Sequence, residues 1–204
     1  MAVVSSPLST LRRFARPKPL VEQCELCGAP LPPEHQHLLE PAKRRLACAC
    51  DACAILFDAG ENARFRRVPR RIQVLRGFQL TDAQWASLHL PINLAFIYRS
   101  SPAKRVIAMY PSPAGATESL LSLESWDELI AENAILREFE PDVEALLIHR
   151  IAEHREYYRV PIDECFKLVG VIRTHWRGLS GGYTVWGEIT RFFGDLNARG
   201  GAHA

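Results

Sequence analysis

Five of the six cysteines fall within thirty residues and form a pattern typical of metal binding. Cys24-Glu-Leu-Cys27-Gly28 is followed, after nineteen residues, by Cys48-Ala-Cys50-Asp-Ala-Cys53. Two sulfurs separated by two residues can bind one tetrahedral ion when the backbone between them turns tightly. Gly28 permits that turn because a glycine φ angle can be positive. The spacing therefore predicts a four-cysteine metal site.

Five cysteines compete for the four places of such a site. We expect the ligands to be Cys24, Cys27, Cys50 and Cys53, with Cys48 as the alternative to Cys50. The apolar residues 54–57 predict a helix with Cys53 in its first turn, where a thiolate gains from the helix dipole. A tight turn followed by a ligand-bearing helix start is the layout of treble-clef zinc sites. Cys48, if left over, is either a packed thiol or a redox-active one.

Zinc is favoured over iron, because a closed shell of four thiolates is its commonest structural use. Rubredoxin-like iron is the alternative, but both of its Cys-x-x-Cys turns usually carry a following glycine, and Ala54 follows Cys53 here. The first residues show no secretory signal, so a cytoplasmic location is expected. In that reducing compartment, clustered cysteines bind metals rather than form disulfides.

His35 and His37 lie between the two cysteine groups as His-Gln-His. They are candidates for a secondary metal site or a catalytic pair, since neutral imidazole binds metals and transfers protons. Nucleases of the His-Asn-His type have a related pattern, but they need a further His or Asn in the closing helix. Residues 54–57 offer neither. We therefore expect the two histidines to stabilise their loop, and no catalytic residue is identified.

Charge is divided along the chain. Residues 61–76 contain six arginines against Glu61, and residues 118–156 contain eleven acids against three arginines. A surface with one positively charged and one negatively charged region suits binding to another protein. Nucleic acid is a second candidate partner, but aromatic residues that could stack on bases are sparse in the arginine run. We expect a docking surface formed by Arg64, Arg66, Arg67, Arg70 and Arg71.

Composition divides the chain into three parts. Residues 1–20 combine hydroxyl and basic side chains with three prolines, which is typical of a flexible tail. Residues 21–60 form the cysteine module. Residues 62–200 are expected to be one α+β domain with a mixed or antiparallel sheet and C-terminal helices. No apolar run reaches eighteen residues, so membrane insertion is not expected.

Within 62–200, apolar spacing predicts individual elements. Residues 94–98 and 105–110 predict a hairpin, 157–162 a strand, and 142–151 either a helix or a strand. Alternation over 66–75 predicts one strand, which Pro69 places at a sheet edge. Two amphipathic helices end the chain. Their apolar stripes are Cys165, Leu168, Val169, Ile172, Trp176 and then Val185, Ile189, Phe192, Phe193, Leu196.

Several motifs together resemble those of a family of uncharacterised bacterial proteins. Besides the two cysteine segments and the segment from His35 to Leu39, they include Tyr110-Pro-Ser-Pro-Ala-Gly, Val160-Pro-Ile-Asp-x-Cys165 and His175-Trp-Arg-Gly178. The resemblance covers nearly all of residues 21–195. Genes of that family often lie near those of actinobacterial-type uptake nickel–iron hydrogenases. The resemblance therefore implies an accessory or assembly role with hydrogenase subunits or maturation factors as partners. This inference rests on gene association and not on a mechanism.

Three functions are consistent with these features. The leading hypothesis is a non-catalytic, zinc-stabilised accessory protein that docks on a metalloenzyme or on its maturation machinery. The alternatives are a nucleic-acid-binding treble-clef protein and a rubredoxin-like iron protein with a redox role.

Overall fold

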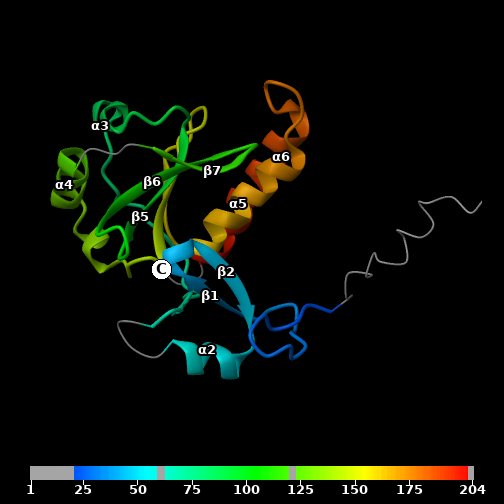
Figure 1. Ribbon diagram of the computed structural model, residues 1–204. Helices are drawn as coiled ribbons and strands as arrows, with labels where there is room; N and C mark the ends of the chain where they lie inside the picture. Colours follow the sequence, from blue (N-terminus) through cyan, green and yellow to red (C-terminus); the bar gives the residue numbers. More distant parts are fainter. Residues whose placement is uncertain (1–20, 59–62, 120–122, 202–204) are drawn as a thin grey trace, which may run out of the picture.

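The computed structural model describes residues 21–58, 63–119 and 123–201, with only the backbone of residues 123–125 (Figure 1). The tail expected at residues 1–20 lies outside the described residues. The described chain is α+β and contains two antiparallel sheets, so the predicted fold class is confirmed. None of the described helices has the length and apolar character needed to cross a membrane.

The smaller sheet belongs to the cysteine-rich segment and has the order β2-β1-β3. Strand β1 (Gln36–Glu40) and strand β2 (Arg45–Ala49) form a hairpin around the short 3-10 helix η1 (Pro41–Lys43). Helix α2 (Asp51–Phe57) starts directly after β2, and strand β3 (Arg66–Arg67) pairs with the free side of β1. This hairpin and the helix behind it place the second group of cysteines beside the first.

The larger sheet has six strands in the order β4-β9-β8-β5-β6-β7, and every neighbouring pair is antiparallel. In chain order, its strands are β4 (Gln73–Val74), β5 (Leu94–Ser100), β6 (Arg105–Ser112), β7 (Gly115–Ser119), β8 (Glu144–His149) and β9 (Glu156–Pro161). The central strands are apolar on both faces, as expected for a sheet that is covered on both sides.

Helices cover the two faces of this sheet (Figure 1). Helix α5 (Ile162–His175) and helix α6 (Gly182–Gly201) pack on one face through the predicted stripes. The opposite face packs against the region of helix α3 (Asp82–Ser87), helix α4 (Leu123–Glu132) and the 3-10 helix η2 (Ala134–Glu138). The sheet thus has an apolar core on each side.

Most predicted elements of this domain are confirmed. The hairpin is β5–β6, and the ambiguous segment 142–151 contains strand β8. The two terminal amphipathic helices are α5 and α6, and the buried thiol of Cys165 lies in the core between α5 and the sheet. Thr81 caps helix α3 with the reciprocal hydrogen bonds of a capping box.

Three predictions from the sequence are wrong: one strand over residues 66–75, a loop at residues 111–115 that ends the β5–β6 hairpin, and Asp163 as the N-cap of the next helix. Residues 66–75 form two short strands in different sheets rather than one, although both are edge strands, as Pro69 suggested. Gly115 opens strand β7 instead of lying in a terminal loop. Helix α5 is preceded by Pro161 at the N-cap position, so Asp163 is inside the helix and its carboxylate is free to contact other groups.

Candidate metal centre

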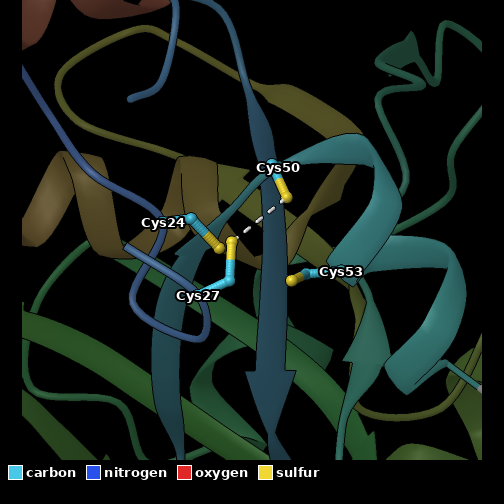
Figure 2. A group of neighbouring side chains, drawn as sticks. All are labelled: Cys24, Cys27, Cys50 and Cys53. Carbon is cyan, nitrogen blue, oxygen red and sulfur yellow. Dashed lines mark hydrogen bonds between the residues drawn. The ribbon is translucent and has the colours of Figure 1, made fainter. Parts of the chain in front are cut away.

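Cys24 and Cys27 are held by a tight turn at the start of the described chain. The amide of Cys24 donates to the carbonyl of Ala29, and the amide of Gly28 donates to the carbonyl of Cys24, both at 2.8 Å. Gly28 has a φ of +78°, which supports the expected role of this glycine. The turn directs both thiols of the Cys-x-x-Cys pair towards the start of helix α2 (Figure 2).

Cys50 and Cys53 approach from the other side. Cys50 is the residue before helix α2, in extended conformation, and Cys53 lies in the first turn of that helix. The sulfurs of Cys27 and Cys50 are 3.7 Å apart, and all four sulfurs lie within 4.8 Å of one another. The structure therefore brings together Cys24, Cys27, Cys50 and Cys53, four soft donors that could surround one metal ion.

Two buried thiols of the cluster, Cys24 and Cys53, have opposite pKa shifts when no ion is bound. Burial works to raise the pKa of Cys24, but backbone amides, that of Cys50 first, outweigh it and lower the pKa to about 6. Burial raises the pKa of Cys53 to about 12, and hydrogen bonds with Cys50 and Cys27 add to that rise. Without an ion, Cys24 therefore loses its proton more readily than Cys53. A bound cation would lower the pKa of every coordinating thiol and favour the thiolate at all four positions.

Apolar side chains enclose the cluster on the side of the small sheet. Cys24 and Cys53 are buried, and they pack together with Leu31, Leu38, Ala49, Ala54 and Phe65. Cys27 remains exposed and Cys50 half-buried. An ion could therefore reach the four sulfurs from the side of Cys27 and Cys50.

Cys48 does not join the four sulfurs. It lies on β2 opposite His37 of β1, and together with His35 these side chains form a second group of metal-binding atoms within 4.8 Å. Burial first, and then the charges of Glu22 and Glu25, raise the pKa of the Cys48 thiol. A neutral thiol is a poor nucleophile, so this environment does not favour the redox-active interpretation of Cys48.

The two histidines each contact an acceptor through Nδ1. His35 contacts the carbonyl of Pro32 at 2.9 Å, and His37 contacts the carboxylate of Asp163 at 2.7 Å. The Asp163 hydrogen bond raises the pKa of His37. His35 therefore stabilises its own loop, whereas His37 connects the cysteine-rich segment to helix α5, a contact that sequence alone does not indicate.

The predicted arginine surface is partly occupied by internal contacts. Arg64 donates to Glu40 at 2.9 Å, Arg67 to Gln36 at 3.2 Å, and Arg71 to Glu144 at 3.4 Å. The other two arginines of the predicted docking surface are Arg66 and Arg70. Arg66 lies in β3, and Arg70 lines a cavity together with His37.

The acids and histidines near the β8–β9 hairpin are less exposed than their polarity suggested. Glu144 is 1% exposed and binds Arg159 through both carboxylate oxygens, at 2.8 and 2.5 Å. His149 is also buried, and its Nδ1 lies 2.8 Å from Glu156, directly opposite in the strand register. Their polarity and spacing in the sequence predict surface positions. That prediction is wrong for Glu144 and His149, because hairpin register brings distant polar groups together.

Comparison with known proteins identifies the family. Residues 23–200 match DUF5947, a family of unknown function. The chain belongs to this family. The match spans both the cysteine-rich segment and the larger sheet, and it confirms the resemblance to an uncharacterised family. No curated protein and no solved structure matches the chain.

Proposed function

We propose that this DUF5947 protein is a zinc-binding accessory protein of the cytoplasm whose metal stabilises a protein-docking module. The observation that supports the proposal is the convergence of four cysteine sulfurs, from a tight turn and a helix start, within 4.8 Å. Four thiolates saturate a tetrahedral zinc ion and leave no coordination position for a substrate. The ion would therefore build the module rather than perform chemistry.

The order of elements supports a module of the treble-clef type. A Cys-x-x-Cys turn is followed by the β1–β2 hairpin, and the second cysteine pair begins helix α2. In this arrangement the ion would join the two ends of the segment and stabilise both of them.

Zinc and iron are separated by one measurement on the purified protein. We expect a colourless protein with one tightly bound zinc per chain at the four cysteines. Visible absorbance and stoichiometric iron would establish the rubredoxin-like alternative instead. A protein that contains no metal, and keeps its fold in a strong chelator, would refute a metal centre altogether.

Helix α2 offers a surface for the partner. Ile55 and Leu56 are 71% and 68% exposed within the part of the chain that the structure describes, and Phe57 is exposed beside them. Consecutive exposed apolar side chains are unusual on a protein surface and mark sites of interaction. Together with the family resemblance, they support docking on hydrogenase subunits or their maturation factors.

The docking proposal is tested by affinity capture from cells that express the hydrogenase. Tagged full-length protein should recover hydrogenase components, and the double change Ile55→Asp, Leu56→Asp should abolish recovery while the zinc content stays at one. A double change on an exposed surface of helix α6, Arg191→Asp with Glu188→Lys, serves as the control and should leave recovery unchanged. Recovery that is absent for the unmodified protein, or unaffected by the α2 change, would contradict this role.

A nucleic acid is the less well supported partner. Arg64, Arg67 and Arg71 each bind a side chain of the same protein, so their guanidinium groups are less available to phosphates. A salt-dependent mobility shift with any DNA or RNA would nevertheless reinstate this alternative.

A further inference from the structure

The structure assigns a second metal-binding site, for a zinc-type ion with one open coordination position, to His35, His37 and Cys48. This site is separate from the four cysteines and does not depend on the docking function. His37 and Cys48 face each other across the β1–β2 ladder, and His35 lies two residues before His37. His35 lies one residue before β1, and its ring centre is 5.0 Å from that of His37.

The strand register also separates the two sites. Leu38 and Ala49 alternate with His37 and Cys48 along β1 and β2, and they pack against the core of the four-cysteine cluster. His37 and Cys48 therefore point to the other face of the hairpin, although Cys48 also packs against the four-cysteine core. One donor atom from each of His35, His37 and Cys48 lies within 4.8 Å of the others.

The hydrogen bonds of both histidines leave the same ring atom for a metal. Nδ1 of His35 contacts the Pro32 carbonyl, and Nδ1 of His37 contacts the Asp163 carboxylate. An acceptor at Nδ1 fixes the proton there and leaves a lone pair on Nε2, which is the usual arrangement around metal-binding histidines. Asp163 is thus a positioning residue for His37 rather than a ligand.

His35 supplies an independent observation. Its side chain is only 6% exposed, yet its Nε2 is buried without any hydrogen-bond partner among the described residues. Leaving a buried polar atom unsatisfied is costly, and such atoms are rare in folded proteins. A metal ion bound to Nε2 would satisfy this atom.

The orientation of the rings fits one shared ion. The centres of the His35 and His37 rings are 5.0 Å apart and their planes are 89° apart. Two imidazoles on one tetrahedral zinc have ring centres about 5 Å apart, given metal–nitrogen bonds of about 2 Å. Donor atoms around such an ion are about 3.3–3.6 Å apart. The donor atoms here lie within 4.8 Å of one another, so side-chain rotation would close the site.

A third group of candidate ligands, His149, His154 and Glu156, does not share this geometry. The rings of His149 and His154 are stacked, with centres 4.5 Å apart and planes only 19° apart. A nitrogen lone pair lies in the plane of its imidazole ring. Because the two ring planes are stacked and nearly parallel, their lone pairs cannot point at one ion. His149 is also packed flat against Phe193, which prevents the rotation that a metal would need.

The donor set defines the class of ion. Two imidazoles with one thiolate suit borderline ions such as Zn²⁺, and three protein ligands leave a fourth position for water or a small anion. His35 and His37 line a cavity of about 670 Å³, and Arg70, Lys167 and Arg199 also line it. An ion held there would bind less tightly than at the four cysteines and would be exchangeable.

The test is a Co²⁺ titration of the full-length protein after a weak chelator has removed loosely held metal. We expect one further equivalent of Co²⁺, with a near-ultraviolet charge-transfer band from a single thiolate. Cys48→Ser should remove that band, and Asp163→Asn should weaken the affinity by about 10- to 100-fold. His37→Ala should weaken it further, whereas the control His175→Ala should change nothing.

The outcomes separate the two metal sites. Each variant must retain the metal of the four cysteines, which shows that the module is folded. If no further equivalent binds, or if its band survives Cys48→Ser, the second site is refuted while the zinc module stands. If the four-cysteine metal is missing but a Cys48-dependent equivalent still binds, the proposed function fails and the second site stands.

Discussion

The cysteine module (residues 21–58) and the sheet domain (residues 73–201) are held together by different means. Among the described residues, the core around the four cysteines contains seven buried residues, two of which are cysteines. The cores on the two faces of the six-stranded sheet contain 23 and 12, and the larger one includes Leu39 of β1. A segment of about forty residues rarely buries enough apolar surface to fold without a metal or disulfides. From this difference we propose that a metal ion compensates for the small core of the cysteine module, whereas the sheet domain is stable without one.

Removing one buried cysteine should have the largest effect on the difference in stability between the two regions. Cys53→Ser leaves three thiolates and should abolish tight zinc binding, which in structural sites contributes about 10 kcal/mol or more to folding. Amide hydrogen exchange should rise throughout residues 21–58 while strands β5 and β8 stay protected. The matched change Cys48→Ser should keep the tightly bound zinc. Loss of protection in both regions together would contradict separate stabilisation.

A change in the sheet domain should have the reciprocal effect. Leu147 is fully buried in strand β8, so Leu147→Ala should lower the free energy of unfolding of the sheet domain by up to about 5 kcal/mol. Chemical denaturation monitored by tryptophan fluorescence measures this loss, because all four tryptophans lie in this domain. The zinc content under native conditions should stay unchanged. A loss below about 1 kcal/mol would indicate that the core is not packed as described.

The buried ion pair tests whether polar groups also stabilise the sheet domain. Glu144→Gln removes the buried carboxylate that binds Arg159 and should cost about 3 kcal/mol. Glu138 contacts the same arginine at 3.6 Å, but its side chain is 65% exposed, so Glu138→Gln should cost less than about 1 kcal/mol. Equal effects of the two changes on the denaturation midpoint would argue against the burial of this pair.

The smallest effect is expected where the two regions meet. Glu118 of β7 accepts from Arg44, beside η1, at 2.8 Å and also binds Arg105, and these contacts lower its pKa. A carboxylate with a lowered pKa in the folded state stabilises the protein above its unfolded pKa. That stability is lost as the pH falls through the folded value.

Glu118→Gln should therefore cost up to about 1 kcal/mol at neutral pH, and the difference from the unmodified protein should shrink towards zero below about pH 4. Unfolding experiments across this pH range measure the difference. A difference that persists undiminished in acid would show that the charge of Glu118 is not responsible.

Local spacing was sufficient to predict much of the fold. The stripes ending at Trp176 and Leu196 identify helices α5 and α6 because a helix repeats every 3.6 residues. The Cys-x-x-Cys spacing with Gly28 likewise indicates the tight turn, since that conformation is local.

Contacts between distant segments could not be predicted in the same way. Nothing in the local sequence shows that Asp163 binds His37, 126 residues earlier, because that contact depends on how α5 packs against the small sheet. The segment 66–75 looks like one strand because its alternation continues through Pro69, although β3 and β4 join different sheets. The separation of Cys48 from the other cysteines likewise follows from strand register, which the spacing of cysteines does not encode.

X-ray absorption at the zinc edge, on full-length protein washed with a weak chelator, tests the central claim most directly. It measures the identity, number and distance of the atoms bound to the metal. We predict one zinc per chain with four sulfur neighbours at about 2.3 Å. An absence of zinc, or a zinc ion whose nearest neighbours are mainly nitrogen or oxygen, would contradict the four-cysteine centre.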